Sequence, residues 1–153
     1  MSDLAIILKT SRRFRLLFSA ALIAACTCSG PAPVPGPSLE REMRRAAEAL
    51  ARNPRFIEEL PSIRLSKSGY FYLVGDDGTV LSHPKSGMRG MNFSDLPFVR
   101  AMFGRKAGCM EQEMDSVRRI VLFRTLDNGA MLCLTISASD VADVTSLRCV
   151  RDR

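Results

Sequence analysis

Arginine side chains on one candidate strand are the first sign of binding chemistry in this sequence. Residues 117–126 mix apolar and basic positions and include Arg118, Arg119 and Arg124. Since successive side chains of a strand point to opposite faces, Arg119 faces away from the other two. A guanidinium on the concave side of a sheet suits an organic acid, because its N–H groups pair with both carboxylate oxygens. We therefore take Arg119 and Arg124 as candidate ligand-binding residues, although surface exposure is the default for each.

Two further side chains, Tyr72 and His83, occupy positions where they could meet a ligand. Tyr72 lies in the middle of the aromatic run 70–74. Either its hydroxyl enters a pocket, or its ring packs in the core and the hydroxyl remains in contact with solvent. His83 is the only histidine of the chain and precedes Pro84. It either senses protonation or fixes a loop through a hydrogen bond, and we favour the second role.

Catalytic and metal chemistry find little support in the sequence. The acidic pairs Asp76/Asp77 and Glu111/Glu113 are explained by a turn and by an exposed strand face. No motif places the histidine beside a serine or cysteine, and a chain with one histidine and no CxxC lacks a zinc pattern. We therefore predict a protein that is not an enzyme and uses no cofactor.

The first thirty residues have the pattern of an export signal. Three arginines precede the apolar run 16–25, which is too short for a bilayer span of about 20 residues. Residues 22–26, Leu-Ile-Ala-Ala-Cys, resemble the bacterial lipobox, in which the cysteine is acylated. We predict a signal peptide over residues 1–25, lipidation at Cys26 and a cell-envelope location facing the periplasm or the exterior. An ordinary secretory signal cut nearby is the alternative.

Composition and charge narrow the class further. The chain has 22 basic and 16 acidic residues. Removal of residues 1–25 takes away four basic residues and one acidic residue, so the remainder has a net charge of +3. Dispersed arginines at that charge give no support for nucleic-acid binding. The 128 residues that follow make a tether rich in proline and glycine, residues 26–37, and one small domain. Beyond Cys26 four cysteines remain, whose three complete pairings stay open, and Cys133 is expected as a buried free thiol.

The remaining pattern predicts an α+β domain over residues 38–150. Apolar residues at helical spacing predict a long first helix capped by Ser38, and residues 54–60 predict a short second helix stopped by Pro61. Five strands are expected, over residues 70–74, 79–83, 109–114, 117–126 and 131–137. Between the second and third strands, a loop and a helix capped by Ser94 or Asp95 form a crossover, and residues 140–148 make a closing helix or tail. One antiparallel sheet with helices packed on it follows.

Three blocks, residues 69–74, 77–84 and 90–99, resemble the Cache domain, the extracytoplasmic PAS-like sensor module of bacterial receptors and kinases. The resemblance covers about residues 38–145 and is to the single rather than the double form. It implies a five-stranded antiparallel sheet with a long N-terminal helix and a ligand bound between the sheet and the crossover of residues 88–103.

The resemblance also indicates which ligands to expect. Members of the family that bind amino acids carry an arginine where this chain has Leu96, and a second aromatic residue where it has Val99. Leucine offers no hydrogen bond, so amino-acid recognition by that route is not expected. Phe98 keeps the aromatic character and Arg100 lies nearby, so both join the candidate ligand site, although helical rotation aims Arg100 in a different direction.

We therefore expect a sensor-like lipoprotein that binds a small molecule, with an organic acid among the candidates, and that contacts the membrane through its lipid anchor. The pattern lacks a transmembrane output segment, so a signal would pass through a signalling or envelope partner protein. The alternative is a ligand-free structural or assembly lipoprotein that pairs through the helix of residues 38–52. A binder should hold a closed, partly polar pocket and gain thermal stability with its ligand, whereas an assembly module should have a filled core and an apolar stripe on that helix.

Overall fold

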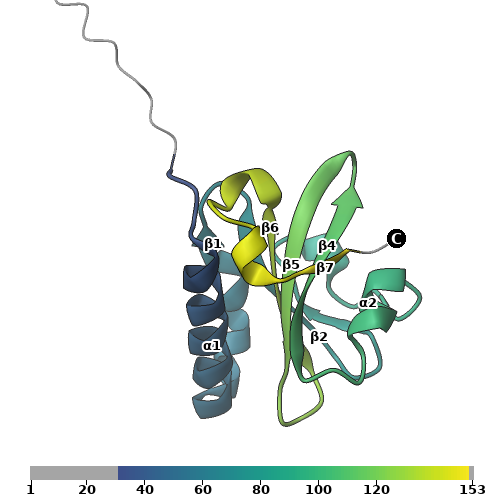
Figure 1. The fold of residues 1–153 in the computed structure, drawn as a ribbon. Helices are drawn as coiled ribbons and strands as arrows, with labels where there is room; N and C mark the ends of the chain where they lie inside the picture. The colour runs from purple at the N-terminus through teal and green to yellow at the C-terminus, as the bar shows by residue number, and fades with distance from the viewer. Residues whose placement is uncertain (1–30, 152–153) are drawn as a thin grey trace, which may run out of the picture.

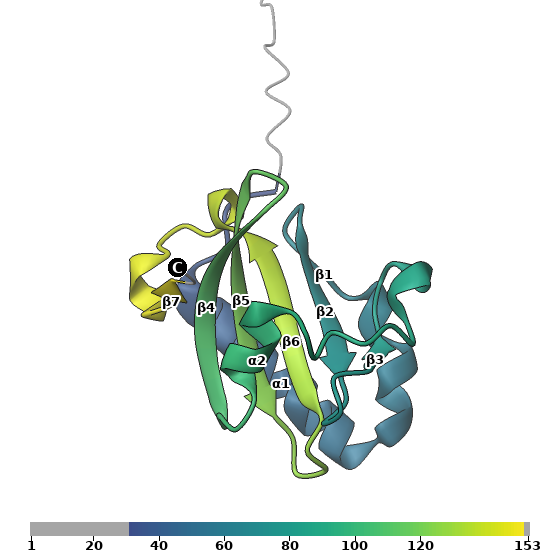
Figure 2. The same ribbon diagram turned by 90° about the vertical axis from the view of Figure 1, so that its right-hand side faces the viewer.

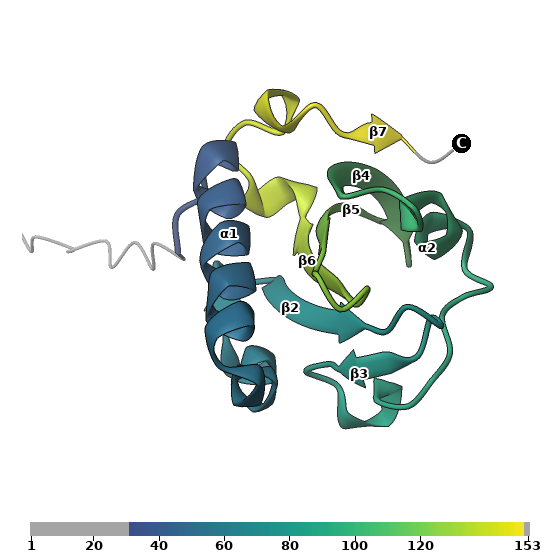
Figure 3. The same cartoon turned by 90° about the horizontal axis from the view of Figure 1, so that it is seen from below.

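Helix α1 (Gly36–Arg52) covers one face of a curved antiparallel sheet, and the short helix α2 (Pro97–Met102) lies on the other face (Figures 1 and 3). The structure is a computed structural model and describes residues 31–151. The predicted signal peptide, Cys26 and Cys28 lie outside the described residues. The predicted α+β class and the helix-bearing crossover are confirmed.

Helix α1 packs on the sheet because its apolar residues recur at helical spacing. The buried positions include Leu39, Met43, Ala46 and Leu50, and the exposed positions include Glu40, Arg41, Arg44, Arg45 and Glu48. The helix begins earlier than predicted, because Pro35 is its N-cap and a proline suits the first turn, so Ser38 lies inside the helix and not at its cap. Within residues 31–151, neither helix has both the length and the apolar character that a bilayer span requires.

Five strands form the antiparallel sheet that the sequence predicts. They are β2 (Gly69–Val74), β3 (Val80–Ser82), β4 (Ala107–Met114), β5 (Val117–Thr125) and β6 (Met131–Ser137), in the order β3-β2-β6-β5-β4. Strand β6 lies between β2 and β5 (Figure 2), with Cys133 opposite both Tyr72 and Phe123. The sheet therefore joins segments that are far apart in the sequence at its centre.

Two short strands extend the edges of this sheet. Strand β1 (Arg64–Leu65) pairs with the start of β2, and β7 (Val150–Arg151) runs parallel to β4. A disulfide joins Cys109 of β4 to Cys149 beside β7, and Cys133 is the buried free thiol that the sequence predicts. The disulfide fixes the C-terminal segment against the edge of the sheet.

The predicted second helix and closing helix are both 3₁₀ turns. The first region holds η1 (Pro54–Glu58) and η2 (Leu60–Ser62), so Pro61 lies within a turn and does not end it. The closing region holds η4 (Ala138–Asp140) and η5 (Thr145–Leu147). Such short segments lack the length that a stable α-helix needs.

The chain just before α1 is tied to the end of β6. The amide of Val34 donates to the carbonyl of Asp140 at 2.8 Å, and its carbonyl accepts from the amide of Ala142 at 3.0 Å. The Asp140 carboxylate accepts from the amide and the hydroxyl of Ser68, between β1 and β2, at 3.0 and 2.8 Å. The last residues of the predicted tether, from Val34 onward, thus belong to the folded body.

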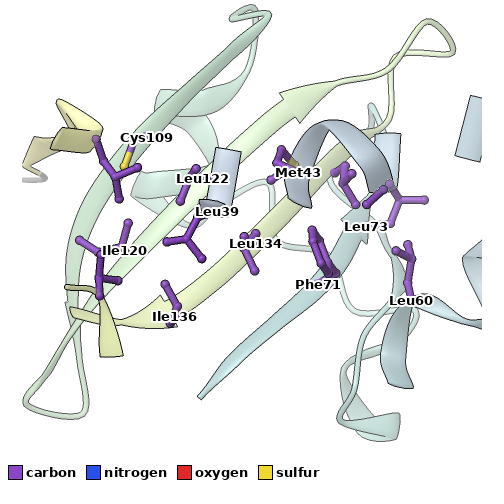
Figure 4. Close-up of a cluster of buried hydrophobic side chains, with 14 of the residues drawn as sticks. Leu39, Met43, Leu60, Phe71, Leu73, Cys109, Ile120, Leu122, Leu134 and Ile136 are labelled. Atoms are coloured by element: carbon purple, nitrogen blue, oxygen red, sulfur yellow. The ribbon is translucent and has the colours of Figure 1, made fainter. Parts of the chain in front are cut away.

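The largest hydrophobic core lies between α1 and the sheet (Figure 4). Leu39 and Met43 of α1 lie above strand side chains that include Phe71, Ile120 and Leu134. Leu134 is 0% exposed, and full burial of such a side chain contributes about 1.5–3 kcal/mol to stability. This layer positions the sheet whose other face carries the candidate site.

The crossover between β3 and β4 carries the 3₁₀ turn η3 (Ser86–Met88) and α2. Helix α2 begins after Leu96, which makes no side-chain capping bond, so the predicted caps Ser94 and Asp95 are wrong. The physical reason is Pro97, whose fixed φ starts the helix one residue later.

The crossover is fastened to the turn between β2 and β3. The amide of Phe93 donates to the carbonyl of Gly78 at 2.8 Å. Gly78 has a φ of 87°, and a Cβ atom there would lie 2.7 Å from the backbone nitrogen of Ser94. Glycine is required at this turn both for its conformation and for the close approach.

Candidate functional site

A pocket of about 240 Å³ lies between the sheet and the crossover, where the sequence places the ligand. Its lining comes from all five main strands except β3, and from the crossover. The lining residues are Tyr70, Tyr72, His83, Lys85, Met88, Met91, Phe93, Leu96, Phe98, Gln112, Met114, Arg119 and Thr135. Because this face of the sheet is concave, a small molecule can be held between the strands and the crossover.

Three rings form an aromatic cluster at one side of this crossover pocket. Tyr70 and Tyr72 alternate along β2 and so point to the same face. The Tyr70 ring meets His83 edge-on with their centroids 5.4 Å apart, and the Tyr72 and His83 centroids are 5.6 Å apart. The cluster therefore offers both apolar ring surface and polar ring atoms to a ligand.

Tyr72 lines the pocket and is buried. Its exposed fraction is 4%, and its side chain is hydrogen-bonded to Cys133. Burial, together with the Cys133 side chain, raises the pKa of Tyr72 well above its usual value. Burial also raises the pKa of the Cys133 thiol to about 12, so this thiol stays protonated and is not a nucleophile.

His83 fixes the start of the crossover, as the sequence predicts. Its Nδ1 accepts a hydrogen bond from the backbone amide of Lys85 at 3.0 Å. The neutral ring consequently carries its hydrogen on Nε2. Desolvation lowers the pKa of His83 below its ordinary value, so the ring is neutral at physiological pH.

Arg119 is the basic residue of β5 that reaches the crossover pocket. Its Nε atom is buried and has no hydrogen-bond partner. It lies near Tyr70, where burial raises the pKa of the tyrosine and the Arg119 charge lowers it. Lys85 adds a second positive charge to the lining, Gln112 and Thr135 add neutral polar groups, and no described lining residue is acidic. The pocket is thus suited to a negatively charged group.

The structure brings four of the predicted ligand residues together and leaves two outside. Tyr72, His83, Phe98 and Arg119 line the crossover pocket, and Phe98 is buried in its wall. Arg100 lies outside it, because helical rotation aims its guanidinium at the exposed carboxylate of Asp95, 2.8 Å away. Arg124 is also outside, since it points to the α1 side of the sheet and lines a different pocket. Arg100 and Arg124 therefore do not line the crossover pocket with the other four residues.

Several lining residues have no counterpart among the predicted site residues. Lys85, Met88 and Met91 lie in a loop without apolar periodicity, so only the folded crossover brings them to the pocket. Tyr70 is different, because strand alternation places it on the same face as Tyr72. Strand alternation would therefore have been enough to predict Tyr70 as a site residue from the sequence.

Comparison with solved structures finds sensor domains of similar shape. A Cache chemosensory domain described for carboxylic acid recognition has a TM-score of 0.54 and 14% identity, over 67% of this chain and 92% of its own. A periplasmic sensor domain of a chemotaxis protein has a TM-score of 0.53 and 17% identity, over 67% and 92%. At such identities the likeness shows the fold, that of a single Cache domain.

The other comparisons set the limits of this likeness. No family model and no curated protein matches the sequence. The ligand-binding domain of Mlp24, solved with asparagine, has a TM-score of 0.46 and 20% identity over 57% of this chain. The chain spans only 35% of the length of that domain.

Proposed function

We propose that this Cache-fold domain is an extracytoplasmic sensor module that binds a small carboxylic acid in the crossover pocket, with Arg119 holding the carboxylate. The observation that carries the proposal is the buried Nε of Arg119, which lacks a partner. A buried charged donor without a partner is costly, and a ligand oxygen would satisfy it. Carboxylic acid recognition by a solved Cache domain of the same fold supports this choice of ligand.

The lining favours an acid without an amine. An amino acid presents an ammonium group, which needs a carboxylate or several acceptors when it leaves water. The described lining has two cations, Arg119 and Lys85, and no acidic side chain. The aromatic and methionine side chains would then contact the apolar part of the ligand.

The proposal includes a location outside the cytoplasm, anchored through Cys26, with relay of the bound state to a partner protein. Export is supported by the disulfide between Cys109 and Cys149, since such bonds persist in oxidising compartments. The apolar run and cysteine at the N-terminus support the anchor. The likeness to a periplasmic sensor domain is consistent with a location outside the cytoplasm.

The competing assembly role has less support. It requires an apolar stripe on the long helix, but the apolar residues of α1 are buried against the sheet. The outward positions of α1 carry charges, including Arg41, Arg44 and Glu48. The open crossover pocket also differs from the filled core that an assembly module should have.

The test measures the thermal stability of the full chain with acetate, propionate or pyruvate, and with L-alanine as the amino-acid comparison. We expect the carboxylic acids to raise the melting temperature and L-alanine to have less effect. Arg119→Gln should weaken binding by at least about tenfold, because a hydrogen-bonded charge contact is lost.

Arg118→Gln is the matched control. Arg118 adjoins Arg119 on β5 but pairs with Glu111 at 3.0 Å, so binding should persist in this variant. Flat responses to every acid, or equal losses in the two variants, would refute the proposed function.

A further inference from the structure

A second pocket, of about 340 Å³, shares no lining residue with the crossover pocket. It is bounded by α1, by the paired ends of β4 and β5, and by the segment that follows η5. Leu122 and Met43 contribute apolar surface from the main core. The sensor function proposed above makes no use of this pocket.

Three arginines from three separate segments line this second pocket. Arg105 precedes β4, Arg124 lies in β5, and Arg148 lies between η5 and β7. The Nε atom of Arg124 is buried and has no hydrogen-bond partner. The salt bridges within residues 31–151 involve other arginines, so these three positive charges are not neutralised by a paired acid.

Arg105 is held in place by packing. Its guanidinium lies over the Phe123 ring, 5.3 Å from the centroid. A Cβ atom at Gly108 would lie 2.8 Å from Phe123 Cζ and 3.1 Å from Arg105 Nη2, so the missing side chain of Gly108 provides the space that both occupy. The hydroxyl of Thr125 donates to the Arg105 carbonyl at 2.7 Å, which fixes the backbone as well.

Arg148 is held by the disulfide and by its backbone. Its neighbour Cys149 is bonded to Cys109, which itself lines the second pocket. The Arg148 backbone has a φ of 49°, the left-handed conformation that ends η5. Because this segment is cross-linked to β4, Arg148 is kept near the other two arginines.

We propose that Arg105, Arg124 and Arg148 form a second binding site, for a phosphate group. Glu40 is the only acidic residue in the described lining, so the three guanidinium groups leave an excess charge of +2. A phosphate monoester carries about −1.5 to −2 at neutral pH, and its oxygens match the donor fork of arginine. Three arginines offer more N–H donors than the two oxygens of a carboxylate can accept, and a phosphate group has further oxygens for them.

The test is isothermal titration calorimetry of the full chain, oxidised and in a phosphate-free buffer, with inorganic phosphate as the probe. We expect one site per chain, and at least about tenfold weaker binding in Arg124→Gln and in Arg148→Gln. Arg148 is exposed, so its variant tests the site even if Arg124→Gln affects folding. Absence of binding to the unmodified chain, or tighter binding of malonate than of phosphate, would overturn the proposal of a soluble phosphate ligand.

Two controls separate this site from general charge and from the crossover pocket. Arg44→Gln removes an exposed arginine from the outer side of α1, and Arg119→Gln removes the arginine of the other pocket. Both should bind phosphate as the unmodified chain does. A loss in Arg44→Gln as large as in Arg124→Gln would show non-specific attraction and overturn the proposal.

A phosphate group can also come from a lipid headgroup, and a second arm tests that source. The full chain carrying Cys26→Ser, which removes the expected acylation site, is mixed with phosphatidylcholine vesicles that contain or lack phosphatidic acid. Binding that requires phosphatidic acid and Arg124, without binding of inorganic phosphate, assigns the site to lipid headgroups. Absence of binding in both arms overturns the phosphate site altogether.

Discussion

The two faces of the sheet are built from alternate residues of the same strands, yet their chemistry differs. In β6, Leu132, Leu134 and Ile136 face α1, whereas Met131, Cys133 and Thr135 face the crossover. The α1 face holds the larger hydrophobic core, made mostly of aliphatic side chains. The crossover face carries tyrosines, a histidine and an arginine around an open pocket. A period of two thus lets the same strands contribute to the largest hydrophobic core on one face and to the crossover pocket on the other.

Substitutions should therefore affect stability most on the α1 face. Leu134→Ala removes a fully buried side chain there and should lower the free energy of unfolding by about 2–5 kcal/mol. The neighbouring substitution Thr135→Ala, beside the crossover pocket, should cost less than about 1.5 kcal/mol. Urea denaturation of the two variants measures the difference, and equal losses would contradict the division between the faces.

A substitution at Gly78, in the turn to which the crossover is hydrogen-bonded, should have an intermediate effect on stability. Gly78→Ala forces a side chain into a positive-φ position and against the backbone of Ser94, so we expect a loss of about 1–3 kcal/mol in unfolding free energy. Gly87→Ala is the matched control, because a Cβ atom there has no neighbour within 4 Å. Urea denaturation tests both, and a Gly78→Ala variant as stable as the Gly87→Ala variant would show that the fastening of the crossover is dispensable.

The smallest expected effect is the pH dependence due to His83. Its pKa in the folded protein is lowered from the ordinary value of 6.5, so the unfolded chain takes up the proton first as the pH falls. The stabilising contribution of the neutral His83 ring is therefore fully present above pH 6.5. It declines as the pH falls below 6.5, until the ring is protonated in the folded protein as well. His83→Gln should flatten this decline in urea denaturations between about pH 5 and 8. If the unfolding free energy of His83→Gln depends on pH as in the unmodified chain, other titratable groups control this dependence.

Much of the fold follows from the sequence because its strands are long and patterned. The predicted run 131–137 coincides with β6, and the other main strands differ by one or two residues at their ends. Strands β1 and β7 are two residues long each, so they carry no period and form only because a neighbour pairs with them. The short 3₁₀ turns near Pro54 and Thr145 resemble helix starts in sequence, but they lack the length to become α-helices.

Strand alternation in the sequence also predicts part of the two candidate sites. Alternation correctly separates Arg119 from Arg124, but it does not tell which face holds which pocket. Lys85 and Arg148 reach their pockets through loops whose paths depend on tertiary contacts, so no local pattern marks them. Loop residues of this kind are where sequence reasoning misses the site.

The hydrogen bonds that join Val34, Asp140 and Ser68 have a mechanical consequence. Ser68 is two residues before Tyr70, and its hydroxyl also accepts from the amide of Ser137 at the end of β6. A ligand that moves Tyr70 therefore has a short route to the place where the chain leaves the body, at Val34.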